Sequence, residues 1–102
     1  MKFGLPEKAL KRIIEVFKKH PQVDQVLLYG SRAKGNFKPS SDIDLTVIAP
    51  ELKWKDINRI SLELDDLLLP YSIDISLYHH ISDPDVLDHI KRVGKNFYQK
   101  NG

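Results

Sequence analysis

The fold of this sequence is decided by two short stretches, Gly30-Ser31-Arg32-Ala33-Lys34-Gly35 and Ser41-Asp42-Ile43-Asp44. The first follows the apolar run 23–29, which predicts a strand because β-formers stand at both of its ends. The second begins a further strand over 42–49, which a proline ends. Glycine, asparagine, proline and serine between the strands predict a loop over 30–41. If the two strands are antiparallel, both stretches lie at the same end of the sheet.

Helical and strand patterns surround these two stretches. Apolar spacing predicts helices over 6–19, 54–69 and 83–93, and clean alternation predicts a third strand over 72–78. The helix between the second and third strands implies that those two strands are parallel. The order is therefore α-β-loop-β-α-β-α, a single α/β (α+β) domain of residues 1–102 with a three-stranded mixed sheet packed against helices. The apolar stripe of the middle helix consists of Ile57, Ile60, Leu64, Leu67 and Leu68.

Two aspartates, Asp44 and Asp74, stand in the middle of predicted strands, where aspartate is disfavoured. Side chains two residues apart on a strand face the same way, about 6.6 Å apart, so Asp42 and Asp44 point to one side of the sheet. Asp74 joins them if its strand is the parallel neighbour. Three carboxylates so close repel one another unless cations lie between them. Their oxygens suit Mg²⁺, and a pair of such ions can stabilise the attacking and leaving oxygens of a displacement at phosphorus.

The loop after the first strand has the residues that a phosphate chain needs. Gly30 lets the backbone approach a phosphate, and loop N–H groups together with the Ser31 hydroxyl can hold it. Arg32 and Lys34 add positive charge to the same loop. These residues therefore predict a nucleotide-binding turn beside the carboxylates.

Charge is segregated along the chain although the net charge is only +2. Residues 1–38 carry nine Lys/Arg against three Asp/Glu, whereas residues 39–90 carry three against eleven. Either this is an ordinary solvated surface, or the basic part meets a phosphate chain and the acidic part meets cations. The sequence contains no cysteine, no signal-peptide pattern and no apolar run long enough to span a membrane, which favours a cytoplasmic protein.

The two stretches together resemble the signature of the DNA polymerase β-like nucleotidyltransferase superfamily. The resemblance rests on Gly30-Ser31, on the ten residues between Ser31 and Asp42, on Asp42-Ile43-Asp44, and on a third aspartate in a later strand. The ending 90–98 adds to it, and within the superfamily the sequence is most similar to the minimal nucleotidyltransferases, which include the MntA-type antitoxins. The resemblance implies a palm-like nucleotidyltransferase fold.

The resemblance also implies roles for single residues. Asp42 and Asp44 would ligate two Mg²⁺ ions (or Mn²⁺), and Asp74 would complete the metal site on the acceptor side and help to deprotonate the attacking hydroxyl. Gly30 and Ser31 would hold the triphosphate of an NTP, most readily ATP, with Arg32 assisting. The family often has an arginine where this chain has Lys34, and a lysine offers charge but not the planar fork of arginine.

Three functions follow from the resemblance. The first is transfer of a nucleoside monophosphate, AMP in the leading case, to a tyrosine hydroxyl of a HEPN-domain toxin, which silences the toxin. The second is a binding module that covers a HEPN partner without catalysis. The third is a small-molecule, aminoglycoside-type adenylyltransferase, which the absence of a second domain disfavours. Direct binding to nucleic acid or to a membrane is not expected.

Other conspicuous residues favour structural interpretations. His79 and His80 are adjacent in a predicted strand end, where neighbouring side chains point to opposite faces and cannot easily share a metal. Phe37 lies in the loop and is interpreted as an exposed aromatic, with contact to a base or a partner as the alternative. Trp54 and Tyr71 flank the middle helix and are expected in the core or at its rim.

Overall fold

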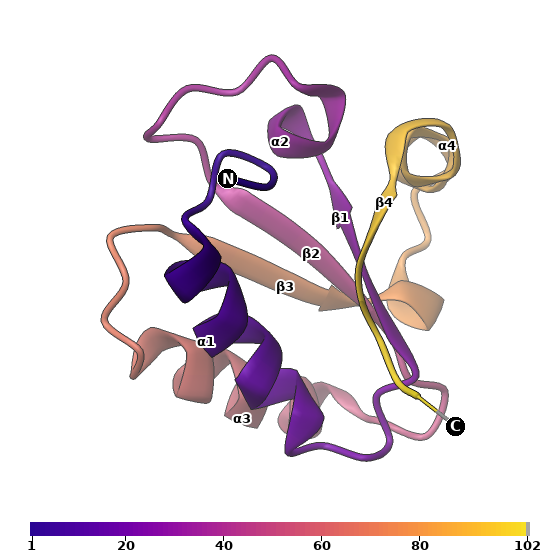
Figure 1. Cartoon of the computed structure of the whole chain (residues 1–102). Helices are drawn as coiled ribbons and strands as arrows, with labels where there is room; N and C mark the ends of the chain where they lie inside the picture. Colours follow the sequence, from indigo (N-terminus) through magenta and orange to yellow (C-terminus); the bar gives the residue numbers. More distant parts are fainter. Residues whose placement is uncertain (102) are drawn as a thin grey trace.

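A four-stranded mixed sheet with strand order β3-β2-β1-β4 forms the centre of the computed structural model, which describes residues 1–101 (Figure 1). Along the chain the elements are α1 (Glu7–Lys18), β1 (Gln25–Tyr29), α2 (Ser31–Lys34), β2 (Ile43–Ile48), α3 (Trp54–Asp65), β3 (Ile73–Leu77), the 3-10 turn η1 (Tyr78–His80), α4 (Pro84–Val93) and β4 (Lys95–Gln99). None of the helices in this described part of the chain is long and apolar enough to cross a membrane.

The strand pairing confirms the predicted α/β architecture. β1 and β2 are antiparallel, and β2 and β3 are parallel, with α3 as the crossover between them. The sheet differs from the prediction by one strand, because β4 pairs antiparallel with β1. This strand was not predicted because it is a sheet edge in which only Phe97 is buried, so its sequence shows no apolar alternation.

The two faces of the sheet have different chemistry. One face packs against α1 and α3, and Figure 1 shows these two helices side by side along the sheet, with α4 on the side of β1 and β4. Alternate residues of β2, namely Ile43, Leu45 and Val47, are buried in this apolar core. The residues between them, including Asp44 and Thr46, therefore face the other side of the sheet.

Two predicted elements differ from those in the structure. The helix predicted over 54–69 ends at Asp65, and Leu68, predicted as part of its apolar stripe, is 88% exposed with a φ of 55°. Leu67 and Leu68 donate backbone hydrogen bonds three residues back, to Leu64 and Asp65, so the helix tightens and turns away there. The predicted loop 30–41 contains the four-residue helix α2, which is too short to leave a periodic signal.

Candidate active site

Three aspartates approach one another on the face of the sheet opposite to α1 and α3. Asp44 and Asp74 are direct register partners in the parallel pair β2–β3, so their side chains leave the same face from neighbouring strands. Asp42 lies two residues before Asp44, directly before β2 begins. The predicted position of Asp74 beside Asp44 is confirmed.

Electrostatics show that these carboxylates interact. The pKa of Asp44 is raised above the ordinary value of an aspartate, first by burial and then by the negative charges of Asp74 and Asp42; the nearby His89 partly opposes the rise. Asp44 is half-buried whereas the other two aspartates are exposed. A carboxylate that repels its neighbours in this way attracts any cation that enters the cluster.

Gly30 brings the backbone against this cluster. It has a φ of 75° and a ψ of −157°, a combination that is essentially limited to glycine. A Cβ atom at this position would overlap the Asp44 carboxylate, coming within 3.2 Å of Cγ and closer still to Oδ2. α2 begins directly after it, and the Ser31 hydroxyl makes no hydrogen bond within residues 1–101, so it is free to contact a ligand.

Two further residues at the site, His89 and Tyr29, were not predicted. The Gly30 N–H donates to His89 Nε2 over 3.0 Å, so α4 holds the turn from outside, and the His89 ring lies edge-on to the Tyr29 ring. His89 occupies the apolar side of α4, where a lone histidine gives no functional signal. Tyr29 directly precedes Gly30, and this adjacency is the one signal that could have indicated it.

Tyr29 and two hydroxyl residues line the sheet beneath the carboxylates. Tyr29 is the register partner of Asp44, and its pKa is raised by burial and by the charges of Asp74 and Asp44, while the Ser76 hydroxyl opposes the rise. Ser76 Oγ donates to Thr46 Oγ1 over 3.1 Å, and Thr46 is fully buried. The acidic cluster therefore lies on a polar floor contributed by β1, β2 and β3.

A turn with a glycine pressed against a carboxylate, beside two aspartates from parallel strands, suits the handling of phosphates with cations. The family model of polymerase β nucleotidyltransferases matches residues 11–102, which include every residue of this site. The chain belongs to the polymerase β nucleotidyltransferase family. A comparison with curated proteins finds no match to this nucleotidyltransferase domain.

Solved structures share the fold of the nucleotidyltransferase domain. A chain of a toxin–antitoxin crystal structure with AMP-PNP superposes with a TM-score of 0.72 at 22% identity, covering 89% of this chain and 73% of that one. The structure of a tri-AMPylated Shewanella oneidensis HEPN toxin with its MNT antitoxin gives 0.68 at 19% identity, with 92% and 72% covered. A Sulfolobus solfataricus protein named as a candidate nucleotidyltransferase gives 0.55 at 23% identity, with 91% and 79% covered. At these identities the likeness concerns the fold.

Arg32 does not lie where the sequence predicts it. Its side chain is only 2% exposed, and its guanidinium donates to backbone carbonyls of Phe3, Pro39 and Ser41 instead of facing the open side of the turn. Lys34, by contrast, is exposed. The structure therefore gives Arg32 partners within the protein, and the exposed cations of the loop 30–41 are Lys34 and Lys38.

The donor set of the nucleotidyltransferase domain fits divalent metal ions. Within residues 1–101 no group of three or more His, Cys, Asp or Glu side chains is already arranged as a metal cage. Mg²⁺ normally takes only one or two protein carboxylates and completes its shell with water and substrate phosphates. The mutual repulsion around Asp44, with Asp42 and Asp74 exposed, provides such a partial set.

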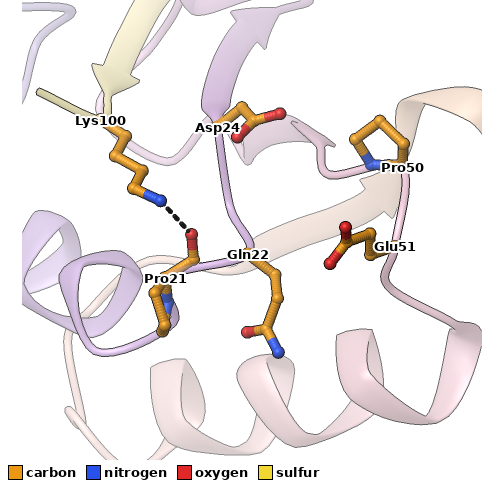
Figure 2. Close-up of a pocket in the computed structure, with 6 residues that line it drawn as sticks. All are labelled: Pro21, Gln22, Asp24, Pro50, Glu51 and Lys100. Atoms are coloured by element: carbon orange, nitrogen blue, oxygen red, sulfur yellow. Dashed lines mark hydrogen bonds between the residues drawn. The ribbon is translucent and has the colours of Figure 1, made fainter. Parts of the chain in front are cut away.

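Other hollows and histidines of the domain lie away from this cluster. A hollow of about 360 Å³ is lined by Pro21, Gln22, Asp24, Pro50, Glu51 and Lys100, which Figure 2 draws. Within it Lys100 Nζ donates to the Pro21 carbonyl over 2.7 Å. The hollow lies at the opposite end of the β1–β2 pair from Tyr29 and Asp44. His79 and His80 belong to η1 and not to a strand, and their exposed rings contact each other edge-on after the far end of β3.

Proposed function

We propose that this domain transfers a nucleoside monophosphate, AMP in the leading case, from an NTP to an acceptor hydroxyl with the help of divalent metal ions. The observation that supports this most strongly is the pairing of Asp44 with Asp74 directly beside the Gly30 turn. The turn offers a place for the triphosphate next to the carboxylates that need cations. A purely structural role explains neither feature, because both raise the energy of the free protein.

Each residue has a defined task in this reaction. Asp42 and Asp44 would hold both metal ions, and Asp74 would complete the acceptor-side ion and receive the proton of the attacking hydroxyl. Gly30 and Ser31 would bind the triphosphate tail. The acceptor oxygen forms a bond to the α-phosphorus while the bond from that phosphorus to the β-phosphate oxygen breaks, and pyrophosphate leaves. When bound, the two cations stabilise the charge that develops on the attacking and leaving oxygens.

For the acceptor, we propose a tyrosine hydroxyl of a HEPN-type toxin, which would make this protein an antitoxin. The proposal rests on the sequence resemblance to the minimal nucleotidyltransferases and on neighbours of the same fold that occur in toxin–antitoxin structures, one with AMP-PNP and one with an AMPylated HEPN toxin. Because these neighbours are antitoxins solved together with a toxin, we propose that the acceptor of this domain is likewise a separate molecule.

The experiment is toxin neutralisation in cells that express the HEPN partner together with the wild type or with the double variant Asp42→Ala/Asp44→Ala. Enzymatic neutralisation predicts that the double variant folds, still associates with the partner and fails to protect. The matched control is Asp65→Ala/Asp66→Ala, which removes two exposed aspartates at the end of α3, on the other side of the sheet. If the double variant protects cells as well as wild type, the domain acts as a binding module.

A second assay addresses the small-molecule alternative. With labelled ATP and Mg²⁺, the partner protein is expected to become labelled. Label that appears only on aminoglycosides, with none on the partner, would assign the domain to the small-molecule adenylyltransferases instead.

A further inference from the structure

Arg32 has a set of contacts that the reaction proposed above does not use. Its Nε and Nη2 both donate to the Ser41 carbonyl, over 3.1 and 2.9 Å, and Nη2 also donates to the Pro39 carbonyl over 3.2 Å. Nη1 donates to the Phe3 carbonyl over 3.0 Å. One buried guanidinium thus binds two points of the loop before β2 and one point of the N-terminal segment.

Aromatic rings complete the surroundings of this guanidinium. Its carbon lies 5.2 Å from the centroid of the Phe37 ring and 5.3 Å from that of the Tyr71 ring. Carbonyl dipoles and ring faces stabilise a buried cation that has no carboxylate partner. We call Arg32, Phe37 and Tyr71 with the three bonded carbonyls the Arg32 clamp.

The clamp acts on the carboxylate cluster through the chain itself. Ser41, which receives two of the four hydrogen bonds, is followed directly by Asp42. Two further hydrogen bonds close the loop just before Asp42: the Lys38 N–H donates to Ser41 Oγ, and the Ser41 N–H donates to the Lys38 carbonyl. Just after Asp42, the Ile43 N–H donates to the Ser72 carbonyl. Holding the Ser41 carbonyl therefore fixes where the Asp42 backbone enters β2.

The N-terminal segment is tied into the same arrangement. Lys2 and Leu5 form a tight turn with positive φ at Phe3 and Gly4, and the Phe3 ring stacks on Phe97 of β4. In Figure 1 this turn lies beside the loop that joins α2 to β2. A Cβ at Gly4 would overlap the Phe37 ring and come within 2.9 Å of Arg32 Nη1, so the turn presses directly on the clamp.

We propose that Arg32 is a positioning residue that sets the place of Asp42, and with it the affinity of the carboxylates for divalent cations, and that it is not a ligand of the triphosphate. The proposal rests on the proposed function, since it concerns the same carboxylates. Arginine is needed because its planar fork reaches three carbonyls at once, whereas a lysine ammonium at the end of a flexible stem does not reproduce that geometry.

The test compares Arg32→Gln, Arg32→Lys and the milder Phe37→Leu with wild type, in the absence of any nucleotide. The first measurement is the affinity for Mn²⁺. We expect Arg32→Gln to weaken it about tenfold or more, the range typical of residues that orient metal ligands, with smaller losses in the other two variants. The second measurement is hydrogen exchange of the Lys38 and Ser41 amides. It should become faster in all three variants, and most in Arg32→Gln.

Binding of inorganic tripolyphosphate without metal separates the two possible roles of Arg32. If Arg32 is a positioning residue, its variants should bind tripolyphosphate with unchanged affinity. Lys34→Gln, on the same short helix but exposed, is the reference for loss of a phosphate contact. Arg59→Gln, an exposed arginine of α3, is the control for lost charge alone. Unchanged Mn²⁺ affinity and loop exchange together with weakened tripolyphosphate binding would overturn the proposal.

The proposal can still be tested if Arg32→Gln does not fold. In that case Phe37→Leu, which keeps an apolar side chain, carries the test, and wild-type exchange of both loop amides in that variant would contradict the clamp. None of these measurements needs a partner or a reaction. A wild-type protein that transfers no nucleotide would therefore defeat the proposed function, while faster loop exchange in the Arg32 variants would still support the clamp.

Discussion

At the scale of single residues, Gly30 carries two independent constraints. Its backbone conformation is open essentially only to glycine, and its missing side chain leaves room for the Asp44 carboxylate. Gly35 offers a comparison five residues later, because it also has a positive φ, of 87°, but a Cβ there would meet nothing within 4 Å. Comparing substitutions at Gly30 and Gly35 therefore separates the effect of backbone strain from the effect of contact with the Asp44 carboxylate.

We predict that Gly30→Ala abolishes divalent-cation binding and nucleotidyl transfer, because the new methyl group displaces Asp44. Backbone strain adds a loss of about 1–3 kcal/mol in the free energy of unfolding. Gly35→Ala should lose stability without losing Mn²⁺ affinity. Calorimetric titration with Mn²⁺ and denaturant unfolding measure both quantities, and equal Mn²⁺ affinity in the two variants would refute the steric argument.

Because the pKa of Asp44 is raised, the free energy of unfolding should depend on pH through this residue. A carboxyl group whose pKa is higher in the folded than in the unfolded protein favours folding while it is protonated, and this contribution is lost as pH rises from about 4 through the folded-state pKa. At neutral pH and without metal, Asp44→Asn should therefore stabilise the protein, by less than about 1 kcal/mol because the group is partly exposed.

The measurement is the melting temperature of both proteins in a chelator from acid to neutral pH. The advantage of Asp44→Asn should be small at the acid end and grow as pH rises. A variant that is less stable than wild type at neutral pH would show that the charge of Asp44 is compensated within the protein itself.

The sequence predicts the positions of residues that follow from local pattern, and it misses the contacts that form across the fold. Asp44 and Asp74 were placed together because strand alternation and a helical crossover fix their sides of the sheet. The contact between Gly30 and His89 joins residues 59 positions apart and leaves no local signal. Arg32 looks like a phosphate contact in the sequence, and only the folded loop shows that backbone carbonyls surround it.

At the scale of elements, α4 serves the site through one hydrogen bond. It packs on β1, and His89 accepts the N–H of Gly30. We predict that His89→Ala lowers kcat/KM for transfer about tenfold by loosening the turn, a typical cost for losing one residue that orients a site. His89→Gln, whose side chain can also accept a hydrogen bond, should recover part of the loss.

Hydrogen exchange of the Gly30 amide gives a readout that is independent of activity. It should be faster in His89→Ala than in wild type. The exposed His80→Ala, in η1, is the control and should leave both activity and exchange at Gly30 unchanged. If the Gly30 amide exchanges as slowly in His89→Ala as in wild type, then α4 does not hold the turn.

The elements show where sequence patterns stop being informative. Helices α1, α3 and α4 and strand β3 are predicted by periodic apolar spacing. Strand β1 is predicted by an apolar run with β-formers at both ends, and β2 by the stretch that Pro50 ends. β4 is held by its pairing with β1 and by the packing of its two aromatic residues, Phe97 on Phe3 and Tyr98 on Phe17. These partners are distant in sequence, so neither the edge strand nor its place beside β1 could be derived from local pattern.

At the scale of the whole molecule, the sheet separates the basic helix α1 from the aspartate cluster. The lysine-rich helix α1 covers the apolar core face, while the aspartates lie on the opposite face, so the basic helix does not stand over the carboxylates. The free protein thus keeps an unneutralised acidic cluster, and cations should stabilise the folded state through it.

We predict that Mn²⁺ at about 100 times its dissociation constant raises the melting temperature of wild type by roughly 10–20 °C, from a binding contribution of about 2.7 kcal/mol. The double variant Asp42→Asn/Asp44→Asn should show no such rise. Scanning calorimetry with and without Mn²⁺ measures the difference. An equal rise in both proteins would place the cation elsewhere on the molecule.

The most direct test of the central claim, that these carboxylates support nucleotidyl transfer, is to incubate the protein with its HEPN-type partner, Mg²⁺ and ATP labelled at either the α- or the γ-phosphate. We predict label on the partner from α-labelled ATP, none from γ-labelled ATP, and none from either with Asp42→Ala/Asp44→Ala. Label from the γ-phosphate, or undiminished α-label with the double variant, would contradict the claim.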